Sequence, residues 1–407
     1  LDNLNFIFNI EDKKYKFLEI ETLFNKIKLN SPSIVIEEKN SLFIVSGKIL
    51  NKEKDIPFDK IKNLLTSHYH DLNLKDIQLE SDNNFSFEVS KKFKFSNLNI
   101  NSEINLSKLT YKNNFKPIQK YFPEIKELIN LKNHKIKLNY NKDKIKITGS
   151  GKILIEDNED EISYEISKKD DQYYFKKIFE IKQNILIDEL QYKKEKNKKA
   201  IIKIEGSLNK NNNLFFNEIY LIENNNSILL KNLNLDNELK VSDIDLFELD
   251  YKNNNKIYNH IYLKKNKKNY ILEGKSFDAS QIINNIMDSD NSDKSIFSNL
   301  NSKITLNIKK TYIDNINFIN NLSGNINYTN NKIDNLKLES VFLNKKNISL
   351  SIVTNKNNEK ITTLVTGYPK PLIKRYKFIK GFEDGYLDFR SIKKDGVSNS
   401  LLIIDNF

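Results

Sequence analysis

The chain has 407 residues, no cysteine and a formal net charge of +12, from 66 Lys and Arg against 54 Asp and Glu. Without cysteine, disulfides, thiolate metal sites and cysteine nucleophiles are excluded. The positive charge is carried almost entirely by Lys, whereas base and phosphate recognition favours Arg, so we expect no nucleic-acid partner. An aromatic content of 11% argues against disorder.

The first 250 residues alternate apolar and polar residues in many short runs, which is typical of half-buried β-strands. We expect two helices among them. One begins at Pro57 and has apolar residues at helical spacing up to Leu65, and the other runs from Pro117 to Leu131 with a kink or restart at Pro123. Gly149-Ser150-Gly151 interrupts the alternation and predicts a bend or bulge between strands.

Two further helices are predicted in residues 251–407. The first covers Ser276 to Met287, with Ser276 as its N-cap, and its apolar residues Phe277, Ile282, Ile283, Ile286 and Met287 are expected to cover the sheet or groove. The second is brief, from Pro371 to Phe378. Because Gly and Pro number only 10 and 6, we expect Asn to form many of the turns.

Residues 299–353 show the alternation most clearly, in short runs joined by turns rich in Lys and Asn. Short connections make neighbouring strands antiparallel, and alternation keeps like side chains on one face. One face should carry Ile304, Leu306, Ile308, Ile326, Tyr328, Leu336, Leu338, Ile348, Leu350 and Ile352. The other should carry Thr305, Asn307, Asn327, Lys337, Ser349 and Ser351.

These patterns predict a mainly β fold, a long twisted antiparallel β-gutter with an apolar groove and a few short helices. A sheet of so many strands rarely stays flat and open. The few helices are too short to cover its apolar face. The face must therefore close as stacked sandwiches, bend into a gutter, or be covered by something other than protein.

Catalytic and metal-binding motifs are missing. His68 and His70 form the only cluster of metal-ligand residue types, and without a second cluster we expect a polar helix end rather than a metal site. No phosphate-binding loop and no nucleophile elbow occurs. We therefore predict a non-enzymatic protein with no catalytic residues, no metal and no cofactor.

Three segments near the C-terminus occur in an order that resembles the C-terminal region of AsmA-like proteins of the YhdP type. They are Gly274-Lys-Ser-Phe-Asp278, Leu322-Ser-Gly324, and the stretch from Gly367 to Phe389 that contains Gly381-Phe-Glu-Asp-Gly385. The glycines of the last segment are further apart than in the family. The resemblance covers residues 251–407, and it divides the chain into a strand-rich gutter segment, 1–250, and a family-like segment continuous with it.

The resemblance implies a bridge-like lipid-transfer protein, anchored in the inner membrane by a helix upstream of Leu1 and facing the periplasm. Phospholipid acyl chains would be its partners and would cover the apolar face. The inner and outer membranes would be reached through parts outside this segment, since both ends of the sequence look like cuts in a longer protein. The alternative is a structural or assembly factor for the cell envelope, built as stacked β-sandwiches or acting like a chaperone.

Overall fold

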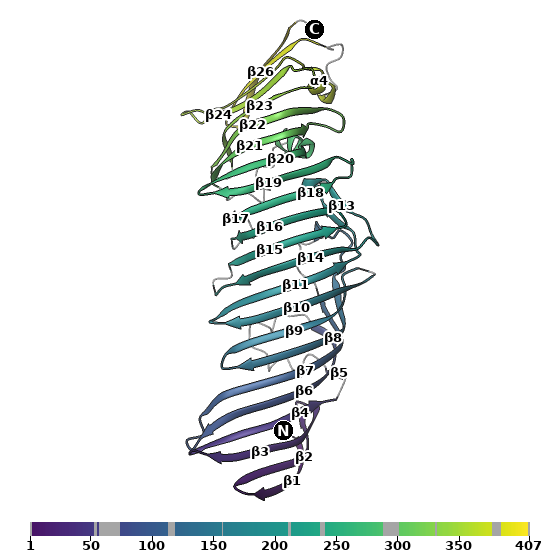
Figure 1. Cartoon of the computed structure of the whole chain (residues 1–407), viewed down its shortest axis with the longest axis vertical. Helices are drawn as coiled ribbons and strands as arrows, with labels where there is room; N and C mark the ends of the chain where they lie inside the picture. The colour runs from purple at the N-terminus through teal and green to yellow at the C-terminus, as the bar shows by residue number, and fades with distance from the viewer. Residues whose placement is uncertain are drawn as a thin grey trace. The chain divides into compact units, whose positions relative to one another are not determined.

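The fold is mainly β and mostly antiparallel, with few and short helices, which confirms the predicted fold class. The structure, a computed structural model, describes residues 2–52, 55–56, 74–112, 119–156, 158–210, 213–236, 241–287, 301–329, 332–376 and 384–405. Most strands pair with the strand that precedes or follows them in the chain (Figure 1). The chain forms two compact units, residues 1–185 with 194–211 (unit 1) and residues 186–193 with 212–407 (unit 2).

Unit 1 is a ladder of antiparallel strands in the order β1-β2-β3-β4-β6-β7-β8-β9-β10-β11-β14, with β5 beside β6. Their bounds are β1 Asp2–Glu11, β2 Lys14–Phe24, β3 Ile27–Lys39, β4 Leu42–Asn51, β5 Asp55–Ile56, β6 Leu74–Ser90, β7 Phe95–Lys112, β8 Leu128–Asn141, β9 Lys144–Leu154, β10 Glu159–Lys169, β11 Gln172–Ile181 and β14 Ala200–Leu208. Between β11 and β14 the chain forms β12 Ile185–Ile187, the short 3-10 helix η2 Asp188–Leu190 and β13 Tyr192–Lys194.

Among the described strands of unit 2, pairing is antiparallel except in the parallel pair β20–β21. Its strands are β15 Leu214–Glu223, β16 Asn226–Leu235, β17 Val241–Asp243, β18 Leu246–Lys252, β19 Tyr258–Asn266, β20 Asn269–Asp278, β21 Ser302–Tyr312, β22 Phe318–Thr329, β23 Lys332–Val341, β24 Asn347–Thr354, β25 Lys360–Thr366, β26 Tyr386–Lys394 and β27 Val397–Asp405. Its helices are α3 Ser280–Met287 and α4 Lys370–Tyr376. The division predicted at residue 250, which follows the family resemblance, stays a prediction.

Two-residue hairpin turns join many of these strands, and both turn residues adopt positive φ. Such pairs are Asp12-Lys13, Asn25-Lys26, Asn40-Ser41, Lys142-Asp143 and Asp170-Asp171. Positive φ at both positions matches the right-handed twist of the flanking strands. Asn therefore shares the turns with Asp and Lys, and these turns contain no glycine.

Of the helix predicted from Pro117 to Leu131, the described part is helical only at Gln119. Turns, bends and irregular backbone follow over residues 120–127, and Leu128 already begins β8, so the prediction is wrong from residue 120 onward. Pro123 has no N–H to donate and disfavours helical geometry in the residue before it. Residues 128–131 instead pair with β7, with Ile129 buried against Ile153 and Ile155. The helix predicted from Pro57, with His68 and His70 at its end, lies outside the described residues.

The helix predicted from Ser276 begins four residues later, at Ser280. Ser276 and Phe277 belong to β20, because their backbones pair with β21. The predicted N-cap Ser276 is therefore wrong. The Asp278 carboxylate accepts hydrogen bonds from Ser280 N at 3.0 Å and Ser280 Oγ at 2.6 Å, just ahead of the helix. The last predicted helix, from Pro371, is confirmed as α4, which begins at Lys370.

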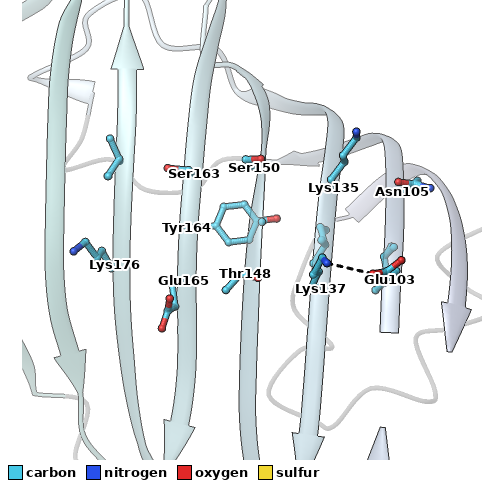
Figure 2. A pocket seen from close by; sticks show the side chains of 14 residues that line it. Glu103, Asn105, Lys135, Lys137, Thr148, Ser150, Ser163, Tyr164, Glu165 and Lys176 are labelled. Carbon is cyan, nitrogen blue, oxygen red and sulfur yellow. Dashed lines mark ion pairs between the residues drawn. The ribbon is translucent and has the colours of Figure 1, made fainter. Parts of the chain in front are cut away.

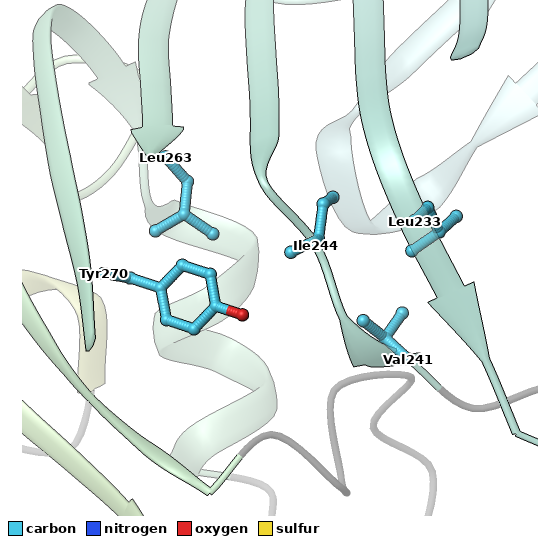
Figure 3. Close-up of a cluster of buried hydrophobic side chains, with 5 residues drawn as sticks. All are labelled: Leu233, Val241, Ile244, Leu263 and Tyr270. Atoms are coloured by element: carbon cyan, nitrogen blue, oxygen red, sulfur yellow. The ribbon is translucent and has the colours of Figure 1, made fainter. Parts of the chain in front are cut away.

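The core of unit 2 includes local apolar clusters near the ends of strands. Leu233, Val241, Ile244, Leu263 and Tyr270 form one of them (Figure 3). The Tyr270 hydroxyl donates to Asp243 Oδ1 at 2.9 Å, which ties the end of β20 to β17. In a second cluster, Ile283 of α3 and Leu372 of α4 pack on Ile313, Ile319 and Phe342. Ile283 thus covers the sheet as predicted, whereas Ile282 is 42% exposed; the Ile286 and Met287 side chains lie outside the description.

Candidate apolar binding face

The ten residues predicted to share a face in unit 2 are brought together by the strand register. Directly paired residues of neighbouring strands point to the same side of a sheet. Three of these pairings are Ile304 with Ile326, Leu336 with Ile352, and Leu338 with Leu350. The central row runs through Leu263, Leu272, Leu306, Gly324, Leu338, Leu350, Leu364 and Phe389. We call these eight residues, with the ten predicted ones, the unit 2 apolar face.

The predicted residues differ in how far they are buried. Leu306, Ile308, Leu336 and Ile352 are buried, with Leu306 at 7% and Ile308 at 2% exposure. The other six, Ile304, Ile326, Tyr328, Leu338, Ile348 and Leu350, are half-buried. On the opposite side Thr305, Asn307, Lys337 and Ser349 are exposed, and Asn327 and Ser351 are half-buried. The face therefore combines a packed floor with apolar side chains that water can still reach.

Gly324 lies in the central row because nothing larger fits there. A Cβ at this position would come within 1.9 Å of the Lys337 carbonyl oxygen, and φ is +152°. The backbones of β22 and β23 thus approach closely between Leu306 and Leu338. The Leu322-Ser-Gly324 motif has a physical reason in this sheet that is independent of any family resemblance.

Unit 1 has a second apolar face, which the sequence reasoning did not single out. The register across β7, β8, β9, β10, β11 and β14 places four rows of side chains together. They are Ile100, Tyr140, Ile145, Lys168, Tyr173, Leu208; Ser102, Leu138, Ile147, Ile166, Phe175, Gly206; Ile104, Ile136, Gly149, Tyr164, Lys177, Ile204; and Leu106, His134, Gly151, Ile162, Phe179, Ile202. We call these residues the unit 1 apolar face. The signal in the sequence is the alternation across residues 98–208.

The bulge predicted at Gly149–Gly151 lies instead on the neighbouring strand. β9 pairs with β10 without interruption from Ile145 to Leu154. The register shift is in β8, where Asn133 adopts φ +52° and His134 follows it. The two glycines make room for rings: a Cβ at Gly151 would come within 2.3 Å of the His134 ring, and one at Gly149 within 2.5 Å of the Tyr164 ring.

His134 and Tyr164 form a small polar site within this apolar face. His134 is 1% exposed, and its Nε2 donates to the Lys152 carbonyl oxygen at 3.0 Å. Nδ1 of the neutral ring then accepts from the Tyr164 hydroxyl, 3.3 Å away. Burial lowers the pKa of His134, while the bond to the Lys152 carbonyl opposes this effect. Both ring nitrogens are satisfied, so His134 is a structural residue.

A hollow of about 620 Å³ lies on the polar side of the same strands (Figure 2). The small side chains of Thr148, Ser150 and Ser163 form its low centre, and longer Lys and Glu side chains surround it. Lys137 pairs with Glu103 at 3.3 Å, and both side chains are largely in solvent. An exposed ion pair of this kind contributes little to stability. The hollow follows from small residues between long ones and has no grouping typical of catalysis.

A buried polar network at one end of unit 2 also went unpredicted. Tyr192 and Tyr251 are both 1% exposed and meet edge to face with 5.4 Å between ring centroids. The Tyr192 hydroxyl donates to Glu223 Oε2 at 2.8 Å, and the Tyr251 hydroxyl donates to the Leu190 carbonyl. Nearby, Asn253 Nδ2 donates to Asp278 Oδ2 at 2.7 Å. The contacts of the Leu190 carbonyl and of Tyr192 fix residues 190–192 to the sheet.

In the described ranges no group of three or more His, Asp or Glu is placed to hold a metal ion. Within those ranges there is also no helix of the length and apolarity that a membrane crossing requires. No family model, no curated protein and no solved structure matches the chain. The resemblance to AsmA-like proteins therefore stays a prediction.

Proposed function

We propose that the two apolar faces bind the acyl chains of phospholipids, and that the chain is a non-enzymatic segment of a bridge-like route for lipid between the inner and outer membranes. The observation that carries the proposal is the central row of the unit 2 apolar face. It holds leucine or phenylalanine in seven of eight successive strands, and Leu338 and Leu350 within it are half-buried and so partly accessible to solvent.

The mechanism that such a face supports is passive. Burial of apolar surface is non-directional and contributes about 0.8 kcal/mol per CH₂ group, so successive positions along a uniform row hold an acyl chain about equally well. An acyl chain can then move from strand to strand, because no single position holds it in a deep energy minimum. The packed floor formed by Leu306 and Leu336 keeps the sheet folded while the accessible leucines contact the ligand.

The test introduces a negative charge into the proposed path of the lipid. The control variant introduces the same charge on the opposite side of the same strand. Leu350→Glu introduces a carboxylate beside Leu338 and Leu364, and Ser351→Glu introduces one beside Lys337 on the polar side. A carboxylate that contacts an acyl chain must be desolvated, which costs several kcal/mol, about 3 or more. Leu306 is unsuitable for this test because it is only 7% exposed, and we expect a glutamate there to destabilise the sheet with or without lipid.

The measurements are native mass spectrometry for co-purified phospholipid, photo-crosslinking to a lipid with a reactive acyl chain, and the melting temperature. We expect lipid on the wild type and on Ser351→Glu, and its loss from Leu350→Glu at a similar melting temperature. Wild-type protein that carries no lipid and gives no crosslink would refute the proposal. Such a result would favour the structural or assembly role, for which the same face would be a surface for protein.

A further inference from the structure

Lys177 is the one mid-strand cation on the unit 1 apolar face. It lies on β11, with Phe175 and Phe179 two residues away on the same side of the strand, Tyr164 directly opposite on β10 and Ile204 on β14. Its side chain is half-buried, and Nζ lies 5.7 Å from the centroid of the Phe175 ring. Burial lowers the pKa of the Lys177 ammonium.

On the polar face of the same strands, by contrast, lysines form ion pairs with glutamates. Lys137 pairs with Glu103 at 3.3 Å, Lys146 with Glu165 at 2.9 Å, and Lys176 with Glu205 at 3.7 Å. The four rows of the unit 1 apolar face contain no Asp or Glu, and no carboxylate among the described residues pairs with Lys177. Lys168, in the outermost row, pairs with Asp171 of the adjacent turn at 3.3 Å.

A partly buried ammonium without a carboxylate partner among the described residues is unfavourable for the fold, and a neutral apolar residue would fit the row better. The arrangement is complementary to a ligand that brings both a negative charge and hydrocarbon. Ile104, Ile136 and Tyr164 continue the row on β7, β8 and β10. At a strand spacing of about 4.8 Å, the four steps from β11 to β7 give an apolar track of roughly 19 Å, enough for a long acyl chain.

We propose that Lys177 binds the phosphate of a glycerophospholipid with a net negative head group, whose acyl chains lie along the neighbouring rows. This inference rests on the proposed function and adds to it a selectivity and a place where lipid is held. A net anionic head group leaves the phosphate charge available to Lys177. In a zwitterionic head group, the ammonium already neutralises that charge within the same molecule.

The experiment offers the purified chain vesicles that contain equal amounts of phosphatidylglycerol and phosphatidylcholine with the same acyl chains. Native mass spectrometry then counts each lipid bound. The variants are Lys177→Met, which keeps the length of the side chain without its charge, Lys177→Arg, and the control Lys176→Met on the opposite face. We expect the wild type to prefer phosphatidylglycerol, and Lys177→Met to reduce that preference roughly tenfold, as for the loss of one charged hydrogen bond. Lys177→Arg and Lys176→Met should retain the preference.

Thermal unfolding separates binding from a role in the fold. If Lys177 serves to bind a ligand and does not stabilise the fold, Lys177→Met should melt no lower than the wild type in the absence of lipid. If both lipids bind the wild type and Lys177→Met leaves their ratio unchanged, the head-group inference fails while the proposed function stands. If the wild type binds neither phospholipid, or only free fatty acid, the proposed function fails with it.

Discussion

Single residues decide where strands can approach, and Gly324 is the sharpest case. Gly324→Ala is expected to destabilise unit 2 by about 2 kcal/mol or more, because its Cβ would collide with the Lys337 carbonyl and its backbone is strained for an L side chain. Gly367→Ala is the matched control, since its nearest neighbours are 3.4 Å or more from the new Cβ. Urea denaturation measures the free energy of unfolding of both variants, and equal values would contradict the close approach of the β22 and β23 backbones at Gly324.

His134 should make the stability of unit 1 depend on pH. Its pKa in the fold is below the unfolded value of 6.5, so the unfolded chain binds a proton first as the pH falls. Its contribution to stability is therefore complete above pH 6.5 and decreases as the pH falls through that value. We expect the wild type to lose more stability than His134→Gln between pH 7.5 and pH 5. The free energy of unfolding at the two pH values checks this, and parallel losses would contradict it.

At the scale of elements, a single substitution in a hairpin turn should increase the stability of the fold. Ser41 follows Asn40 in the turn between β3 and β4 and has φ +63°. Ser41→Gly should stabilise the chain by about 0.5 kcal/mol, because glycine adopts this conformation without the steric cost of a side chain. Ser46→Gly within β4 is the control and should destabilise by a similar amount. The denaturation midpoints of the two variants should move in opposite directions.

The sequence predicts an element well when the interactions that form it are between residues close in the chain. Alternation from Ile304 to Ile352 predicts strands and their common face, because both follow from the period of one strand. The helix predicted at 117–131 is wrong beyond residue 119. Its apolar spacing suits a helix, but residues 128–131 form a strand by pairing with β7, whose paired residues lie about 16 or more positions earlier in the chain. The bulge at His134 depends on Gly151, which lies on another strand, so no local pattern reveals it.

At the scale of the molecule, one short segment interrupts the sequence of unit 1 and belongs to unit 2. Residues 186–193 belong to unit 2 although unit 1 residues precede and follow them. Tyr192 brings a buried ring to Tyr251 and a hydrogen bond to Glu223. A fragment of residues 212–407 lacks these contacts, and we expect it to melt several degrees, about 4 or more, below a fragment of residues 186–407.

Tyr192→Phe in the longer fragment is the control for that comparison. It keeps the ring contact with Tyr251 and removes the hydrogen bond to Glu223, so its melting temperature should fall between those of the two fragments. Identical melting temperatures for the two fragments would show that residues 186–193 do not stabilise unit 2.

The parallel pair β20–β21 also has a consequence for the order in which the chain folds. Antiparallel neighbours joined by two-residue turns form contacts between residues close in sequence, and such contacts form quickly. β20 ends at Asp278 and β21 begins at Ser302, and their parallel pairing requires the chain to return across the width of the sheet. The hairpins on either side can form before this loop closes. In unit 2 we therefore expect the register between Leu272 and Leu306 to form later than the hairpins, and in a growing chain only after synthesis has passed β21.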